Sequence, residues 1–230
     1  IVVTPLVTII TGGFVSTFAG PFLSDMMTGL GDLINSATQL HPFPMGIAVS
    51  TLVGLALTAP ISSAAICIML ELDGIAAGAA AVGCAAQMVG FAVMSYRENK
   101  FGGLLAQGLG TSMLQMGNIV KNPKIWLPAI LTSAITGPLA TCLFQLEMNG
   151  AAVNSGMGTC GLCGPIGVVT GWLAPSEAAA LDGAAAIAPT AMDWIGLVLI
   201  CFVLPAVLTW AFGLFFRKIG WIKENDLKLN

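Results

Sequence analysis

Long segments without a single charged side chain limit what this sequence can fold into. The clearest are 74–95, 125–146 and 194–216, which consist mostly of aliphatic, aromatic and small residues. A helix of about 20 apolar residues spans the hydrocarbon core of a bilayer, and each of these segments is long enough to do so. The sequence therefore predicts a multi-pass membrane protein with a lipid bilayer as its surroundings.

The composition separates the two kinds of membrane fold. Hydrophobic residues make up 57% and charged residues only 8% of the 230 residues, whereas a soluble domain carries about 25% charged residues. Strands of a membrane barrel alternate apolar and polar residues over roughly ten positions, but these segments are continuously apolar. We therefore expect an all-α fold of spanning helices, with no nucleic-acid partner and no metal or cofactor.

The basic residues fall in clusters that constrain the topology. These are Arg97 and Lys100; Lys121 and Lys124; and Arg217, Lys218, Lys223 and Lys228. The positive-inside rule places all of them in the cytoplasm, and the C-terminus with them. Residues 101–117 would then begin and end on the same side of the membrane, so we expect a re-entrant hairpin or a surface helix there.

Two further segments are predicted to be interrupted. Segment 45–70 contains Pro60, so it forms a kinked span or a hairpin. Residues 147–193 must begin and end outside, either as two crossings or as broken, re-entrant helices. Irregular backbone at membrane depth is tolerated only where it is buried in protein or lines a wet cavity. We predict that Pro60 and the glycines of 156–171 interrupt helices and pack against each other or line one cavity.

One element of the sequence occurs twice. LELDG at 70–74 recurs as LEMNG at 146–150, and upstream TAPISSAAICIM at 58–69 corresponds to TGPLATCLFQ at 136–145. Internal duplication is typical of secondary transporters, in which broken helices meet at a central site. The alternative is that two helices rich in Ala and Gly resemble each other by composition alone.

The repeated element supplies candidate binding residues for a solute. A carboxylate at the centre of a membrane helix costs about 2.5–3.5 kcal/mol, so Glu71 and Glu147 indicate a pathway. Carboxylates accept hydrogen bonds from hydroxyl groups, and Asp73 or Asn149 extends that capacity. Asn154, in the glycine-rich segment that follows, could share the solute. The alternative is that both glutamates end their helices at the outer interface.

Two other motifs have both a functional and a structural interpretation. His41 is the only histidine and lies in QLHPFPMG, where flanking prolines fix an extended backbone. It is a candidate hydrogen-bonding residue of the pocket, or else a helix end that faces water. Cys160 and Cys163 form a C-x-x-C motif; thiol chemistry would need a lowered pKa, and the alternative is a closely packed backbone.

Together these motifs resemble the membrane (IIC) component of bacterial sugar phosphotransferase systems, in the IIC-like branch that includes perfringolysin-regulator-like proteins. The resemblance rests on QLHPFPMG, LTAPIS, YRENKFGG and NSGMGTCGLCGPIG, in this order along the chain. It implies a protein of the bacterial cell membrane that works as a homodimer by an elevator-like movement. It also implies separate IIA and IIB subunits that phosphorylate the solute.

The resemblance further implies a division of the chain into parts with different roles. We expect the last span of a truncated scaffold domain at 1–24, an interfacial amphipathic linker helix at 25–44, the substrate (transport) domain at 45–216 and a cytoplasmic tail at 217–230. Within the transport domain, the two repeats are expected near 45–97 and 123–173.

The expected function is that of a permease for a small polar solute of the sugar or polyol class. Carriers of this family hold the sugar with a His, which His41 could supply, and a Glu in a Thr-Glu-Pro element. Here that element reads Thr-Ala-Pro at 58–60 and Thr-Gly-Pro at 136–138, so Glu71 or Glu147 would have to substitute. No catalytic phosphocysteine or phosphohistidine domain is expected in this chain. The alternatives are a IIC-like membrane sensor that no longer transports and a membrane thiol enzyme.

Overall fold

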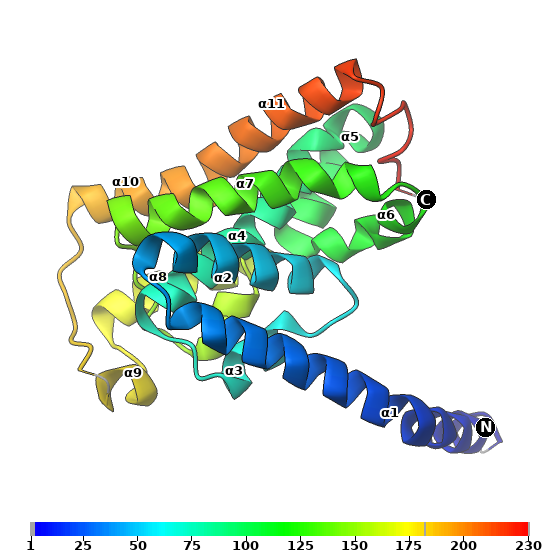
Figure 1. Cartoon of the computed structure of the whole chain (residues 1–230), viewed down its shortest axis with the longest axis horizontal. Helices are drawn as coiled ribbons and strands as arrows, with labels where there is room; N and C mark the ends of the chain where they lie inside the picture. Colours follow the sequence, from blue (N-terminus) through cyan, green and yellow to red (C-terminus); the bar gives the residue numbers. More distant parts are fainter. Residues whose placement is uncertain (1–2, 182, 230) are drawn as a thin grey trace.

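The computed structural model describes residues 3–181 and 183–229, and in these ranges the regular structure is entirely helical (Figure 1). Residues 1–2 of the predicted scaffold span, residue 182, and residue 230 of the predicted tail lie outside the described residues. The α-helices are α1 (Val3–Thr38), α2 (Pro42–Thr58), α3 (Ser63–Met69), α4 (Gly74–Met94), α5 (Tyr96–Leu105), α6 (Met116–Lys121), α7 (Leu127–Pro138), α8 (Cys163–Leu173), α9 (Glu177–Leu181), α10 (Ala191–Val198) and α11 (Leu204–Lys218).

Short 3₁₀ and π-helical turns extend or connect these helices. The π-helical turns are Ala106–Gly110, Leu139–Leu143 and Leu199–Val203, and the 3₁₀ turns are Ser112–Gln115, Pro123–Trp126, Ala152–Gly156 and Cys160–Leu162. The turn at Leu199–Val203 joins α10 to α11, so that these two helices form one continuous rod.

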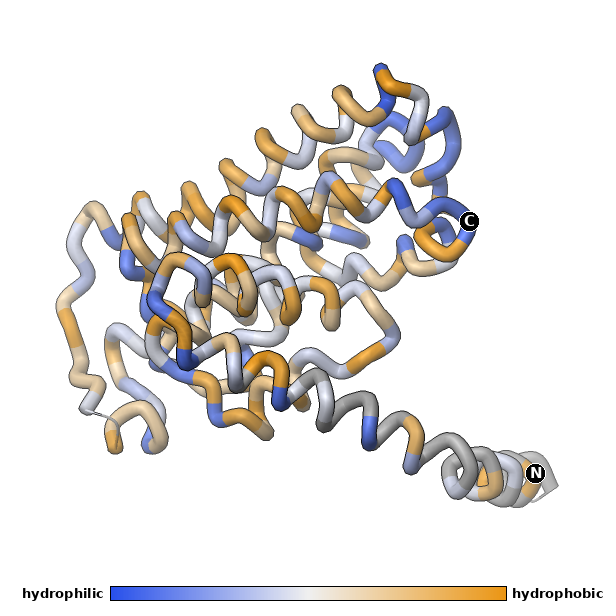
Figure 2. Tube along the Cα trace, viewed as in Figure 1, coloured by the Kyte–Doolittle hydropathy of each residue, from blue (hydrophilic) through white to orange (hydrophobic). Residues whose placement is uncertain are grey.

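Three helical stretches of the described residues are long and apolar enough to cross a membrane: Gly74–Met94, Pro123–Leu143 and Ala191–Lys218. They correspond to the charge-free segments of the sequence and confirm that these segments form helices of membrane-spanning length. Shorter apolar helices occur at Pro42–Thr58 and Cys160–Leu173. Figure 2 shows that hydrophilic residues gather at the end of the bundle where α5, α6 and the C-terminus meet.

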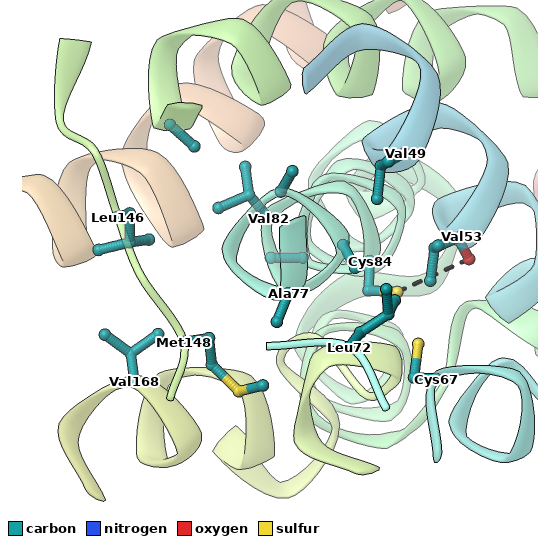
Figure 3. Packing of buried hydrophobic residues seen from close by; sticks show 14 of the residues in the cluster. Val49, Val53, Cys67, Leu72, Ala77, Val82, Cys84, Leu146, Met148 and Val168 are labelled. Atoms are coloured by element: carbon teal, nitrogen blue, oxygen red, sulfur yellow. Dashed lines mark hydrogen bonds between the residues drawn. The ribbon is translucent and has the colours of Figure 1, made fainter. Parts of the chain in front are cut away.

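Helix α4 forms the centre of the fold, with α2, α7 and α11 packed around it. Because α4 is rich in Ala and Gly, its neighbours approach it very closely. A Cβ added at Gly83 would overlap the carbonyl oxygen of Ser50 in α2. Figure 3 shows the surrounding core, in which the Cys84 thiol donates to the Val53 carbonyl at 3.7 Å. Close contact of small residues is how membrane helices associate without a hydrophobic driving force.

Two interruptions of the helical backbone meet inside the bundle. Helix α2 ends at Thr58, and the turn at Pro60 separates it from α3. The second interruption precedes α8 and consists of residues 157–159 with the 3₁₀ turns Ala152–Gly156 and Cys160–Leu162 on either side. The Ser63 hydroxyl donates to the Gly156 carbonyl at 2.7 Å, so the two breaks are joined directly. This confirms the prediction that they pack against each other.

The glycine-rich interruption is shorter than the sequence predicts. Gly158 and Gly161 both have a φ of +53°, a conformation that glycine adopts without the Cβ penalty of other residues. Beyond them α8 is helical throughout, including the glycines of 164–171. These later glycines instead allow α8 to pack closely against the neighbouring backbone. A Cβ at Gly171, for example, would lie 2.7 Å from the backbone nitrogen of Asn149.

Residues 101–117 form a hairpin that enters the bundle and returns to the same end. Its two limbs are joined where the Gln115 side chain donates to Gln107 Oε1 at 2.9 Å. At its inner end, the Gly108 carbonyl accepts a hydrogen bond from the Thr159 hydroxyl at 2.7 Å. The hairpin thus reaches the glycine-rich interruption, as expected for an inserted hairpin and not for a helix on the surface.

Residues 219–229 pack against the mouth of this hairpin and are called the C-terminal clasp below. Leu227 is fully buried, and its carbonyl oxygen accepts hydrogen bonds from Asn99 Nδ2 at 2.7 Å and Gln115 Nε2 at 2.9 Å. The clasp therefore links two parts of the chain: the residues just before the hairpin, at Asn99, and the second limb of the hairpin, at Gln115. The predicted tail at 217–230 begins within α11 and continues as this ordered segment.

Helix α1 differs from the prediction because it runs without a break across the expected boundary between 1–24 and 25–44. Pro21, close to that boundary, lies inside the helix and does not end it. The chain breaks instead at His41, where the following proline disfavours helical backbone, so the expected linker region ends inside α2. Only the last turns of α1 pack on the bundle, for example through Ile34, and its start projects away (Figure 1).

The position of the hairpin generates a prediction about topology. In a cysteine-free background, single cysteines at Lys100 and Lys121, near positions 98 and 122, should react with a membrane-impermeant maleimide from the same, cytoplasmic, face. A cysteine at the exposed Ala186, in the loop before α10, should react only from the opposite face. Inside-out and right-side-out vesicles distinguish the faces. Labelling of Lys100→Cys and Lys121→Cys from opposite sides would contradict the expectation that residues 101–117 begin and end on the same side of the membrane.

Candidate solute-binding site

The two copies of the repeated element, LELDG and LEMNG, lie side by side. The backbone nitrogen of Met148 donates to the Gly74 carbonyl at 3.0 Å, and the Gly74 nitrogen donates to Asn149 Oδ1 at 3.0 Å. The amide of Asn149 in turn donates to Glu147 Oε2 at 3.0 Å. Asn149 is only 9% exposed, so a buried amide connects the two elements.

A cavity of about 270 Å³ opens where these elements meet. On one side it is lined by Asp73, Gly74, Glu147 and Asn149, and on the other by small residues of α9 and the loop that follows it, Ala179, Gly183 and Ala184. Asp73 is the N-cap residue of α4. The positive end of the α4 dipole therefore points to this cavity and stabilises carboxylates there.

The two glycines of the repeated element have different roles. Gly74 has a φ of +54°, which lets the chain turn from the extended backbone of Asp73 into α4. Gly150 is required for close contact, because a Cβ there would overlap the Gly167 carbonyl oxygen of α8. Together they fix the loops that carry Asp73 and Glu147.

The structure brings three of the predicted binding residues together: Asp73, Glu147 and Asn149 all line the cavity. Glu71 lies two residues earlier, is exposed and has a φ of +45°, and it is not among the lining residues. Asn154 lies against α8, where a Cβ on Gly167 would come within 2.6 Å of the Asn154 Cβ.

His41 does not line this cavity either. It occupies the N-cap position of α2 and is exposed. The adjoining Pro42 carbonyl accepts a hydrogen bond from the Thr141 hydroxyl at 2.8 Å, which places His41 beside the end of α7. Because the chain passes from that end into the repeated element at 146–150, His41 and the cavity lie at the same end of the bundle.

The thiols of the C-x-x-C motif are free: neither Cys160 nor Cys163 forms a disulfide. Among the described residues, no group of three or more His, Cys, Asp or Glu side chains is placed to hold a metal ion. The polar side chains that line the cavity are the carboxylates of Asp73 and Glu147 and the amide of Asn149, which suit hydrogen bonding to hydroxyl groups.

Comparison with known proteins identifies the family. The family model described as "Phosphotransferase system, EIIC" matches residues 1–229. The chain belongs to this EIIC family. The predicted resemblance is thereby confirmed, and with it a multi-pass membrane protein of sugar-type phosphotransferase transport that works with other components of that system. No curated protein and no solved structure matches this EIIC chain.

This EIIC protein also contains a buried polar network that the sequence reasoning missed. Gln87 of α4 is fully buried; its Nε2 donates to Ser133 Oγ at 3.3 Å. Its Oε1 accepts from Trp126 Nε1 at 3.0 Å and from Thr58 Oγ1 at 3.3 Å. Thr58, the last residue of α2, also bonds to Ser112 of the hairpin at 2.8 Å. The sequence signal for this network was Gln87 itself, the one Gln in an otherwise apolar span. Such a polar side chain needs hydrogen-bond partners within the membrane.

The network generates a prediction about stability. Gln87→Met keeps the length of the side chain but leaves Trp126 Nε1 without its acceptor, and an unsatisfied buried polar group costs about 1–3 kcal/mol. The midpoint of thermal unfolding of the purified protein in detergent should fall clearly. Gln39→Met, at an exposed position of the chain, is the matched control and should leave the midpoint unchanged. Equal midpoints for both variants would mean that the Gln87 network does not stabilise the packing of the end of α2 and the hairpin against α4.

Proposed function

We propose that this EIIC protein is the permease for a small polar solute of the sugar or polyol class, and that the solute binds in the cavity of Asp73, Glu147 and Asn149. The observation that carries the proposal is the convergence of the two repeated elements on one cavity lined by carboxylates. Its volume, about 270 Å³, lies just below the usual range of ligand pockets, which starts at about 300 Å³. A small solute fits this volume better than a large one.

The chemistry of the cavity supports a hydroxylated solute. An ionised carboxylate offers about four acceptor positions, and on Glu147 the Asn149 amide occupies one of them. The other positions are available to solute hydroxyls, and the Asp73 carboxylate lies in the same cavity. Neutral sugars and polyols present several hydroxyl donors at short spacing, which matches such a set of acceptors.

The arrangement of the broken segments supports the predicted transporter architecture. The interruptions after α2 and before α8, and the hairpin 101–117, meet inside the bundle, as expected for re-entrant segments of an internally duplicated transporter. The basic residues at the other end then lie in the cytoplasm of a bacterial cell, with the C-terminus. Helix α1, which touches the bundle only by its last turns, fits the proposed link to a scaffold domain (Figure 1).

Several parts of the proposal concern the assembled system. The residues from 45 to 216 would form the moving transport domain, in an elevator-like movement against the scaffold domain of a homodimer. Separate IIA and IIB subunits would phosphorylate the solute on the cytoplasmic side. This chain would contribute the pathway and the binding site, and no phosphorylated residue.

One observation favours the alternative, a sensor that keeps the fold but no longer transports. The acid of the family's Thr-Glu-Pro element is absent, and at Gly137 there is no room for it, because a Cβ would overlap the Gly46 carbonyl oxygen. Uptake of the solute by proteoliposomes that contain this protein separates the two functions. Binding without uptake, in the presence of the partner subunits, would favour the sensor.

The proposed site predicts the effect of one conservative substitution. Glu147→Gln keeps the shape of the side chain but replaces a charged acceptor by a neutral one. A hydrogen bond to a charged group contributes about 1.5–3 kcal/mol, so affinity should weaken roughly tenfold to a hundredfold. A panel of sugars and polyols screened by thermal shift supplies the solute, and calorimetry then measures its affinity for wild type and variant.

Glu71→Gln is the matched control, because it makes the same chemical change two residues outside the cavity and should leave affinity unchanged. His41→Gln should cause a smaller loss than Glu147→Gln, since His41 lies at the same end but not in the cavity. Unchanged affinity in Glu147→Gln, with a thermal midpoint equal to that of the wild type, would show that Glu147 merely ends a loop at the interface.

A further inference from the structure

Two adjoining hollows lie at the basic end of the bundle, far from the proposed solute site. The apolar groove, of about 220 Å³, lies between the ends of α4 and α11 and is lined by residues that include Val93, Leu104 and Trp210. The basic cavity, of about 690 Å³, lies between the start of α5 and the C-terminal clasp. Arg97 and Arg217 line both hollows, so the two form one continuous, amphipathic site.

The basic cavity carries an excess of positive charge. Its lining contains four basic side chains and two acidic ones: Arg97, Arg217, Lys223 and Lys228, with Glu98 and Glu224. Arg217 is fixed in position, since its Nη2 donates to Glu98 Oε1 at 2.8 Å and to the Met94 carbonyl at 3.3 Å. Arg97 is exposed and is not engaged in that ion pair. Guanidinium groups bind phosphate oxygens well because their donors form a fixed, planar fork.

Glu98 provides a second, independent observation that points to a ligand. Its side chain is 7% exposed, and its second carboxylate oxygen, Oε2, is buried without a hydrogen-bond partner among the described residues. Buried polar atoms almost always have a partner, and a charged one that lacks it is costly. Glu98 lines the basic cavity, so a ligand there can supply a donor once the carboxylate turns its enclosed oxygen toward the cavity.

The apolar groove indicates what kind of ligand this is. It lies within the candidate span Ala191–Lys218, where Trp210 is 52% exposed, and beside the end of the span Gly74–Met94. In a membrane such a groove faces the hydrocarbon, whereas the basic cavity lies at the level of the headgroups. A small phosphate compound from the cytoplasm would use only the cavity, but a phospholipid would use both hollows.

We propose that this site binds an anionic glycerophospholipid whose headgroup carries hydroxyl donors, as phosphatidylglycerol does. The lipid phosphate lies at Arg97 and Arg217, a headgroup hydroxyl donates to the Glu98 carboxylate, and one acyl chain follows the apolar groove. The lipid thereby joins α4, α11 and the C-terminal clasp at one point. The site is distinct from the solute cavity, and the proposal does not depend on the proposed function.

The test uses the full chain, freed of lipid in a neutral detergent and titrated by native mass spectrometry. Phosphatidylglycerol should bind one to one and raise the thermal midpoint, whereas phosphatidylcholine should do neither. Arg97→Gln should weaken binding of phosphatidylglycerol about tenfold. Lys121→Gln, which removes a charge at the same end but outside the cavity, should leave it unchanged. Equal weakening in both variants would reduce the site to a general surface attraction and overturn the proposal.

Two further ligands test the parts of the site separately. Phosphatidylmethanol has the same charge but no headgroup hydroxyl, so it should bind more weakly than phosphatidylglycerol; equal binding would contradict the role of Glu98. Glycerophosphoglycerol, the headgroup without acyl chains, should show no binding at the same concentrations. If it binds as tightly as the lipid, the site takes a soluble phosphate and the lipid assignment is wrong.

Discussion

Hydrogen bonding of interrupted backbone, inside a bundle that excludes water, is the constraint on which the rest of this structure depends. In hydrocarbon a helix that breaks must find partners for its freed polar groups within the protein. Here the breaks supply partners to one another, through Ser63 to Gly156 and Thr159 to Gly108. The helix α4, made of small residues, forms the wall against which all of them pack. Each break is therefore tolerated only because the others are present.

Features of the backbone that depend on local chemistry could be predicted from the sequence. The charge-free segments predict the spans, and the break at Pro60 follows from the missing backbone donor of proline. Features that depend on tertiary contacts could not be predicted. The family resemblance implies a boundary near residue 24, but α1 continues through it. Likewise, Gln87 in an apolar span indicates a buried amide, but not that α2, α7 and the turn Pro123–Trp126 supply its partners.

The candidate site also depends on tertiary contacts that the sequence does not predict. In the sequence, Glu71 and Glu147 occupy equivalent places in the repeated element, and only the glycine-rich segment with Asn154 that follows Glu147 favours it. Both glutamates are exposed, but the structure distinguishes them because Glu147 lines a cavity with Asp73, α9 and the following loop, whereas Glu71 does not. The contact between the two elements, from Met148 to Gly74, joins residues far apart in sequence. The repeat made both elements candidates for solute binding, but their contact with each other is seen only in the folded structure.

The C-terminal clasp has a consequence for biosynthesis. Asn99 and its partner Leu227 are 128 residues apart, and Gln115 is 112 residues from the same carbonyl. Ribosomes add about 5–20 residues per second. The residues of the clasp are therefore synthesised on the order of ten seconds after the hairpin. During that time its polar side chains need other partners, from water, lipid headgroups or the insertion machinery. Completion of this fold is therefore a late event, which follows the insertion of α11 and not that of the hairpin itself.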